Sequence, residues 1–362
     1  MVKKSFEPQL LPLVNESINY NYFLDELIDA TSKLEVYKEK ILDSKLASRW
    51  FMPTLQQKEA LASSQLEGTQ GTLDGVLTNQ IAPDTENQNL NEVDNYFKAT
   101  ELGMRILNRE SFSNDFFCEI HTALMSGNVR KPDVIGAYRT EQNYIGKNDS
   151  KHSITYIPPK PELVKDLINN LISYINNPQD SFRPLVRIAI IHAQFETIHP
   201  FMDGNGRVGR MLIPLYLYYT KQIELPCFFI SEALERDKLR YYNLLNNIRE
   251  KNDWNEWIKF FLDTVTKQCD KYINIITRIN ELYDSHCKIA CDFTKSSMVI
   301  QVMNMLYKYP IISAKQIVEE IDIPMTSVNR LLSKMVDEKI LITDGKQRNR
   351  KFIYYELLDI IR

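Results

Sequence analysis

The chain has 362 residues, 44% of them hydrophobic and 25% charged, which are ordinary values for a globular protein of two or three folded units. Its formal net charge of −3 excludes a general attraction to nucleic acid or anionic membranes, so any such binding has to be local. The five scattered cysteines favour reduced thiols over a zinc site or a disulfide framework.

Two absences in the sequence concern membranes. No apolar run approaches the roughly 20 residues that cross a bilayer. The first residues also lack the apolar core of a signal peptide. We therefore expect a cytoplasmic protein without a membrane partner.

Helical patterns dominate the chain, and glycine is scarce. Apolar residues recur at helical spacing over 18–80, where one segment runs from Pro53 to Glu67 and stops at Gly68, a suitable C-cap. A polar loop is predicted over 78–91. Further helices are predicted over 91–107, 115–125, 163–176, 184–197, 207–220, 231–249 and 253–284. The segment 184–197 is apolar nearly all round, which is typical of a central buried helix.

The pattern changes between residues 136 and 159. Two short β-prone runs, 144–146 and 154–157, flank the turn-rich Lys147-Asn148-Asp149-Ser150-Lys151. These runs predict a β-hairpin that ends at Pro158-Pro159.

The character of the chain shifts again after Lys295. Three helices are predicted over 298–307, 313–321 and 326–338, the second of them capped by Ser313. Two strands, 339–343 and 351–355, then surround a basic turn. Three helices followed by a hairpin is the order of a winged helix-turn-helix.

The most informative stretch covers residues 199–210 and reads His-Pro-Phe-Met-Asp-Gly-Asn-Gly-Arg-Val-Gly-Arg. Asp203 offers a hard oxygen to Mg²⁺, which usually takes one or two carboxylates together with phosphate and water. His199, with a reference pKa near 6.5, could accept a proton from an attacking hydroxyl. The stretch therefore predicts a site that binds a magnesium nucleotide and activates a hydroxyl toward one of its phosphates.

The remaining polar residues of this stretch suit an anion. A helix that begins near Gly206 presents free N–H groups and a positive dipole end. Gly204 and Gly206 let the backbone approach a phosphate, and Asn205 could bridge phosphate and loop. Arg207 and Arg210 share one helix face and could hold two successive phosphates. Each residue also has an ordinary structural explanation by itself, but the ordered set favours the phosphate site.

The same stretch matches, without departure, the Fic-domain pattern His-Pro-Phe-x-(Asp/Glu)-Gly-Asn-Gly-Arg-x-x-Arg. The chain thus resembles the Fic family, and the resemblance implies AMP transfer from ATP to a hydroxyl of a target protein. It also implies roles by position: His199 as general base, Asp203 as magnesium ligand, Gly204, Asn205 and Gly206 as anion hole, and Arg207 and Arg210 as phosphate clamps. Gly206-Arg207 argues against the relative that acts as a kinase, which has lysine after the asparagine.

A second segment, Ser63 to Gly68, is similar to the Fic inhibitory motif (Ser/Thr)-x-x-x-Glu-(Gly/Asn). Without the resemblance, Glu67 would be interpreted as a solvated residue at a helix C-terminus, where the macrodipole disfavours a carboxylate. The resemblance implies that Glu67 pairs with Arg210, blocks productive seating of the γ-phosphate and belongs to an inhibitory helix in front of the core, the class II arrangement. Some relatives use this glutamate to remove AMP, so AMP removal stays open.

The hairpin predicted over 143–157 resembles the Fic flap, whose edge strand aligns a target segment by β-augmentation. A purely structural hairpin is the alternative. Gly136 to Arg139 before it, and Ser231 after the motif, also lie where relatives build the site. Tyr241 or Tyr242 could pack on adenine, although adjacent tyrosines on a helix are often part of the core.

The resemblance and the patterns together give a mainly α fold with four parts. These are an N-terminal helical domain carrying the inhibitory helix (1–100), a Fic catalytic core with a short hairpin flap (101–262), a linking helix (263–294) and a winged helix-turn-helix (295–362).

The partners of the winged helix stay open at this point. Its 11 Lys and Arg exceed its 8 Asp and Glu, and Lys346, Arg348, Arg350 and Lys351 gather in the predicted wing, as phosphate contacts would. Thr326, Ser327, Asn329, Arg330 and Ser333 could face a DNA groove. Winged helices also serve as protein-interaction or dimerisation modules, so a protein partner or a homodimer is the alternative.

Two further functional hypotheses remain. The chain could be a DNA-binding regulator whose Fic core senses nucleotide, although a sensor would not need the base His199. The enzyme could also transfer another phosphate-linked group, such as UMP or phosphocholine, because the motif grips phosphates rather than the nucleobase. The sequence does not identify the target protein or the modified residue.

Overall fold

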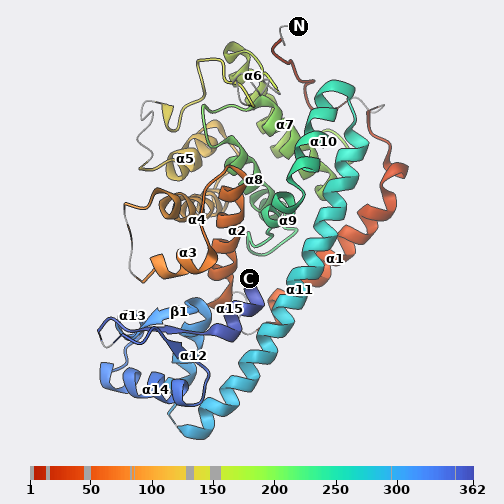
Figure 1. Cartoon of the computed structure of the whole chain (residues 1–362). Coiled ribbons are helices and arrows are strands. Elements are labelled where there is room, and N and C mark those ends of the chain that lie inside the picture. Colours follow the sequence, from red (N-terminus) through yellow and green to blue (C-terminus); the bar gives the residue numbers. More distant parts are fainter. Residues whose placement is uncertain are drawn as a thin grey trace. The chain divides into compact units, whose positions relative to one another are not determined.

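The computed structural model describes residues 4–13, 17–44, 50–81, 84, 86–127, 134–146, 156–294, 296–346 and 348–362. Helices dominate it, as predicted, and the chain divides into two compact units (Figure 1). Unit 1 comprises Met1–Leu34, Ala62–Thr69 and Asp94–Gln268, and unit 2 comprises Glu35–Leu61, Gln70–Val93 and Cys269–Arg362. Four helices contribute residues to both: α1 (Leu24–Asp43), α2 (Met52–Leu66), α4 (Gln88–Leu107) and α11 (Trp254–Phe293).

Unit 1 is built around two consecutive buried helices. Its remaining helices, apart from its share of the four named above, are the 3₁₀-helix η2 (Tyr20–Tyr22), α5 (Asn114–Leu124), α6 (Pro161–Asn176), α7 (Pro184–Ile198), α8 (Asn205–Tyr219), α9 (Ser231–Arg236) and α10 (Lys238–Lys251). Every residue of α7 is buried except Pro184 and Arg187, which confirms the predicted central helix. In α8, all residues from Asn205 to Leu217 are buried.

The loop between α7 and α8 is bounded by two residues in the left-handed conformation. α7 starts with Pro184 at its first turn and ends where His199 adopts φ 51°. α8 starts after Gly204, whose φ is 76°. Because both helices are fixed in the core, these two left-handed residues set the path of the loop between them.

The described part of the predicted hairpin is a single antiparallel bridge between Ile145 and Tyr156. Its turn and residues 154–155 of its second strand lie outside the described residues. Tyr156 exchanges both backbone hydrogen bonds with Ile145, at 3.0 and 3.1 Å, so the carbonyl of Ile157 faces the other way. That carbonyl accepts a hydrogen bond from the N–H of Phe6 at 3.0 Å, so the N-terminal segment lies along the outer edge of residues 156–157.

Unit 2 contains the predicted three helices and hairpin. Its elements, besides its share of the four helices above, are α3 (Leu73–Asn79), α12 (Met298–Lys308), β1 (Ile311–Ser313), α13 (Ala314–Glu320), α14 (Met325–Asp337), β2 (Ile342–Thr343), β3 (Lys351–Ile353) and α15 (Tyr355–Ile361). The strands form an antiparallel sheet in the order β1-β3-β2. Ser313 caps α13 by accepting a hydrogen bond from the N–H of Gln316.

Several boundaries differ from the prediction. The helix predicted over 231–249 is divided at Asp237 into α9 and α10, and α11 continues to Phe293. The strand β1 and the helix α15 were not predicted; three strand residues and seven helix residues give weak periodic signals. The four-part division of the chain remains a prediction. None of the helices in the described part of the chain is long and apolar enough to span a membrane.

Candidate active site

The loop between α7 and α8 is held by its own asparagine. The side chain of Asn205 accepts from the N–H of Phe201 and donates to the carbonyl of Phe201, both at 2.8 Å. Asn205 is 2% exposed. Each end of the amide thus makes one hydrogen bond to the loop, and the predicted bridge from this side chain to a phosphate stays a prediction. Its backbone N–H, in the first turn of α8, is not used by the helix itself.

A histidine that the sequence analysis missed supports the same loop from α5. The Nδ1 of His121 accepts from the N–H of Gly136 at 2.9 Å, so its Nε2 donates to the carbonyl of Asp203 at 3.1 Å. Its ring stacks on Phe201 with centroids 3.8 Å apart. Burial lowers the pKa of His121 to about 4, so the ring is neutral at physiological pH.

His199 is anchored through its backbone. Its carbonyl accepts from Arg139 Nε at 2.9 Å and from Asn143 Nδ2 at 3.4 Å. The same guanidinium also donates to the carbonyls of Pro159 and Ile198. Arg139 is 2% exposed and thus ties the end of α7 to the segment that follows the hairpin. No motif marks this role, because a carbonyl acceptor can belong to any residue.

The ring of His199 is neutral at physiological pH. Burial and then the positive charge of Arg249 lower its pKa, Glu67 raises it and Arg139 lowers it, and the pKa is about 4 as a result. The ring is half-buried. A neutral imidazole at the start of the loop can accept a proton.

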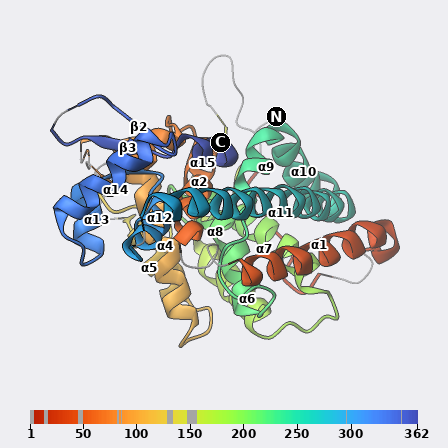
Figure 2. The same ribbon diagram turned by 90° about the horizontal axis from the view of Figure 1, so that it is seen from below.

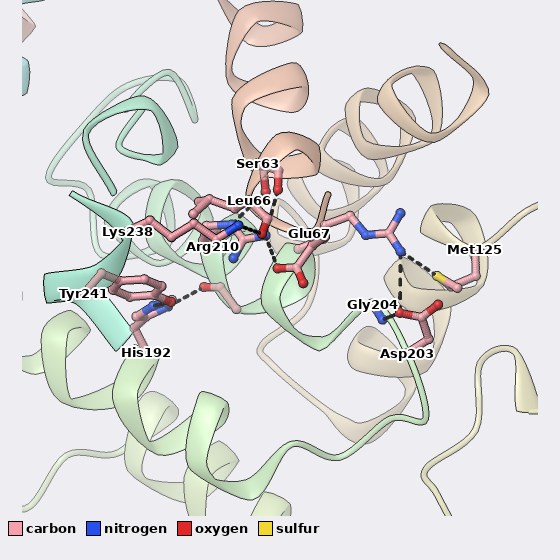
Figure 3. Close-up of polar contacts among 12 residues, drawn as sticks. Ser63, Leu66, Glu67, Met125, His192, Asp203, Gly204, Arg210, Lys238 and Tyr241 are labelled. Atoms are coloured by element: carbon pink, nitrogen blue, oxygen red, sulfur yellow. Dashed lines mark hydrogen bonds and ion pairs between the residues drawn. The ribbon is translucent and has the colours of Figure 1, made fainter. Parts of the chain in front are cut away.

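Arg210 lies at the centre of the contacts between α8 and the end of α2 (Figure 3). Its Nε donates to the Ser63 hydroxyl at 2.9 Å, and its Nη2 donates to the Ser63 carbonyl at 2.9 Å and to Glu67 Oε1 at 2.7 Å. Arg210 is 1% exposed. The structure therefore brings together Ser63, Glu67 and Arg210. In the sequence, Arg210 lies more than 140 positions after the other two.

The Glu67 carboxylate lies directly over the backbone of Gly206. A Cβ atom on Gly206 would collide with Glu67 Oε1, so only glycine leaves room for the carboxylate at this point. Burial raises the pKa of Glu67, but the charge and hydrogen bond of Arg210 lower it more, and the pKa ends below its usual value. Glu67 directly follows α2, and Gly68 (φ 98°) supplies the left-handed residue that ends the helix.

The two predicted phosphate clamps reach different partners. The Nη2 of Arg207 donates to the sulfur of Met125 at 3.5 Å and lies 3.9 Å from Asp203 Oδ1. Arg210 instead points to Glu67. The Asp203 side chain is 69% exposed, and its Oδ1 accepts from the N–H of Gly204 at 2.6 Å.

A second buried carboxyl lies close to Arg210. Glu196, in α7, is 6% exposed, and a Cβ on Gly209 of α8 would collide with its Oε1. Burial raises its pKa to about 7, while Arg210 lowers it and Glu67 raises it. The sequence analysis did not single out Glu196, which stands inside an apolar helix.

Tyr241 was predicted as a nucleotide contact, and the structure places it in the core instead. It is 0% exposed, and its hydroxyl hydrogen-bonds Nε2 of His192 at 3.0 Å (Figure 3). The other ring nitrogen of His192 donates to the carbonyl of Gly209 at 2.9 Å. Tyr242 is the half-exposed member of the pair, and its pKa is raised by burial and then by Glu67. Of the two tyrosines that were considered for adenine, Tyr242 is therefore the one with exposed surface.

His192 makes the stability of the fold depend on pH. Burial lowers its pKa to about 4, below the value near 6.5 of an unfolded histidine. Between these values the unfolded chain binds the extra proton, so stability is full above pH 6.5 and falls as the pH falls. By pH 5 the loss from this group is about 2 kcal/mol. Urea unfolding of the wild type and of His192→Gln at pH 7.5 and pH 5 checks this; an equal pH dependence of the two proteins would contradict it.

Lys238 is a further contact to the end of α2. Its Nζ donates to the carbonyl of Leu66, the last residue of that helix, at 2.6 Å (Figure 3). A cation at a helix C-terminus is stabilising. The predicted sequence motifs do not include this lysine, because it binds a backbone carbonyl.

If the end of α2 inhibits the site, Lys238→Met is expected to raise activity about two- to tenfold. The reason is that one hydrogen bond holding this segment, with a net value of about 0.5–1.5 kcal/mol, is lost. Initial rates with labelled nucleotide measure the effect. Lys251→Met, at the other end of α10, is the matched control. A comparable rise in that variant would show that the hydrogen bond from Lys238 to Leu66 does not hold the site inhibited.

Two family models match this chain. Residues 111–217, which include the loop, match the model described as the Fic/DOC family, and residues 24–105, which include Glu67, match its N-terminal region. Among curated proteins, the chain is 31% identical over 119 residues to the protein adenylyltransferase fic-1 of Caenorhabditis elegans, covering 32% of this chain and 22% of that protein. It is 26% identical over 170 residues to a probable protein adenylyltransferase of Aquifex aeolicus, covering 45% and 48%. The chain thus spans less than half the length of each of these relatives.

Solved structures share the fold. A Fic family protein from Desulfovibrio desulfuricans superimposes with a TM-score of 0.61 at 17% identity, covering 96% of this chain and 98% of that one. Fic-1 from C. elegans gives a TM-score of 0.54 at 20% identity, covering 70% and 74%.

Proposed function

The chain belongs to the Fic/DOC family, and from this membership we propose that it is a protein adenylyltransferase inhibited by its own Glu67. The observation that carries the proposal is the bond from Arg210 to Glu67 over Gly206, beside the neutral ring of His199. On this proposal, a phosphate site, a general base and an inhibitory carboxylate lie together. The adenylyltransferase names of the relatives support the choice of AMP.

In the proposed reaction, the hydroxyl oxygen of a target side chain attacks the α-phosphorus of ATP. The bond from this phosphorus to the bridging oxygen breaks, and pyrophosphate leaves with its electron pair. His199 accepts the hydroxyl proton, for which its ring must be neutral, and its lowered pKa supports this. The first-turn N–H groups of α8 and the guanidinium of Arg207 would bind the phosphate oxygens.

Asp203 is the residue that would hold Mg²⁺. Its side chain is 69% exposed, and no group of three or more His, Cys, Asp or Glu that could hold a metal ion occurs among the described residues. A cation at this point would take one protein carboxylate and complete its shell with phosphate and water, as Mg²⁺ commonly does. When bound, it would neutralise phosphate charge.

We propose that Glu67 inhibits by occupying the Arg210 fork. Its carboxylate takes one donor of Arg210 and the space over Gly206, where a phosphate oxygen would otherwise approach. Ser63 takes two more donors, and Lys238 holds the preceding carbonyl. Nucleotide seated against Arg210 must therefore displace the end of α2.

We assign the target segment to one edge of the hairpin. The outer edge of residues 156–157 already pairs with Phe6. The edge of residues 143–146 has its own anchor, since Asn143 Nδ2 donates to the carbonyl of Phe201 at 2.9 Å, and Tyr144 is 55% exposed. Docking by main-chain hydrogen bonds would position a hydroxyl near His199 with little choice of sequence.

Nucleotide selectivity tests the proposal. The Glu67→Gly protein is incubated with ATP labelled in the α- or the γ-phosphate, and with α-labelled UTP and labelled CDP-choline. Protein labelling from α-labelled ATP alone is expected. Labelling from UTP or CDP-choline in its place would favour transfer of another phosphate-linked group, and release of AMP from labelled protein by the wild type would add the reverse reaction.

A further inference from the structure

Unit 2 has a groove that the proposed transfer reaction does not use. It has a volume of about 620 Å³ and is lined by Ile81 and by residues of three further parts of the unit. Asn329 and Ser333 come from α14, Ser313 and Lys315 from the start of α13, and Arg350 and Lys351 from the strand β3 and the turn before it. The groove therefore lies between α14, the start of α13 and the strand β3 with the turn before it.

The helix α14 has two different faces. Its buried face, which fixes it to the unit, consists of Val328, Leu331, Leu332 and Met335. Its exposed face carries Thr326, Asn329, Arg330 and Ser333, at the spacing of one side of a helix. Amide, hydroxyl and guanidinium groups in this pattern are those that read base edges in the major groove.

The turn between β2 and β3 is fixed by hydrogen bonds and carries exposed basic residues. Asp344 Oδ1 accepts from the N–H groups of Lys346 and Lys351 at 3.3 and 3.2 Å. Arg350 Nε donates to the carbonyl of Lys346 at 2.9 Å. Lys346, Arg348 and Arg350 are exposed, and the loop extends out from the sheet (Figure 2). Cations presented in this way suit a phosphate backbone.

The local charge contrasts with that of the whole chain. The sequence carries a formal net charge of −3, yet Lys315, Arg350 and Lys351 line this groove, and Arg330, Lys346 and Arg348 lie on the helix and the turn that contribute to its lining. Glu319 pairs with Lys315 at 3.5 Å, and Asp344 is engaged by the turn itself. The apolar residues of the groove lining are Ile81, Ala314, Met325 and Phe352, of which Phe352 is buried and Met325 is 40% exposed. A protein interface would have a more apolar and aromatic centre.

We propose that this groove binds double-stranded DNA, with the exposed face of α14 in the major groove and the β2–β3 turn on the phosphate backbone. The site takes duplex rather than a protein because its exposed helix face is polar and its rim is basic. This function is separate from AMP transfer, and its test does not depend on the roles assigned to His199 and Glu67.

The test measures binding of the full chain to a fluorescently labelled random-sequence duplex by anisotropy, from 50 to 200 mM salt. Affinity is expected to fall linearly on a log–log plot, with a slope of about −0.9 for each neutralised phosphate. Lys346→Ala and Arg348→Ala should each reduce the steepness of this slope by about 1. Lys339→Asn is the matched control, because Lys339 is an exposed cation outside the groove with a left-handed φ of 62° that asparagine tolerates.

Sequence readout supplies an independent measurement. Selection from a random duplex pool should yield a preferred site for the wild type, and Asn329→Ala should relax that preference while keeping the salt slope. Circular dichroism confirms that each variant is folded. The proposal is overturned by the absence of salt-dependent binding at 50 mM salt, by equal slopes in the turn variants and the wild type, or by a protein partner that depends on the same residues without any binding of duplex.

Discussion

Glu67→Gly is expected to raise the rate of AMP transfer roughly ten- to a hundredfold over the wild type. The variant removes a charge-assisted hydrogen bond of 2.7 Å to Arg210, and such bonds contribute about 1.5–3 kcal/mol. About 1.4 kcal/mol changes an equilibrium tenfold. The state in which Arg210 is free to bind a phosphate therefore gains population roughly ten- to a hundredfold. The rate of label transfer from α-labelled ATP to protein measures it.

Glu67→Gln separates the effect of the negative charge of Glu67 from the effect of the space that its side chain occupies. The amide can still occupy the position over Gly206, but it no longer neutralises the buried guanidinium of Arg210. Its rate should therefore lie between those of the wild type and Glu67→Gly. Equal rates for the wild type and the glycine variant would show that Glu67 does not inhibit.

His199→Ala, made in the Glu67→Gly background, is expected to reduce transfer by roughly 10²- to 10⁴-fold, the usual contribution of a positioned general base. The cause is the loss of the proton acceptor, since the phosphate-binding groups of α8 are untouched. Single-turnover rates with saturating ATP measure the chemical step.

Calorimetric titration with ATP gives the control for this variant. Nucleotide affinity should change little, because Arg207, Arg210 and the first turn of α8 remain in place. Transfer that survives the loss of His199 would remove it from the reaction. Loss of ATP binding together with transfer would assign it to nucleotide binding instead.

The residues that the sequence predicted well are those whose role follows from chemical type and spacing. Gly204 has the positive φ that its position requires, and Gly206 leaves the space that the carboxylate fills. Glu67 and Arg210 meet although 143 positions separate them, which only the family resemblance could suggest. The buried helix α7 followed from an apolar pattern that continues all round.

The clearest departure concerns the direction in which a side chain points. Tyr241 faces the core, and this direction cannot be read from residue type. Arg207 and Arg210 are three apart on one helix, and their long side chains reach different partners.

The residues that the sequence analysis missed mostly bind backbone carbonyls. His121 holds the carbonyl of Asp203 and Lys238 holds that of Leu66, and Arg139, which the sequence analysis named only for its place near the site, holds that of His199. A carbonyl acceptor leaves no mark on the sequence, since every residue has one. Such contacts appear only when the fold brings distant segments together.

The most direct test of the central proposal is mass spectrometry of a cell lysate treated with ATP and one of three proteins. These are the wild type, Glu67→Gly, and Glu67→Gly with His199→Ala. The account predicts peptides carrying one AMP on a serine, threonine or tyrosine hydroxyl, abundant with Glu67→Gly, scarce with the wild type and absent with the double variant. Equal AMP modification by all three proteins, or phosphate in place of AMP, would contradict it.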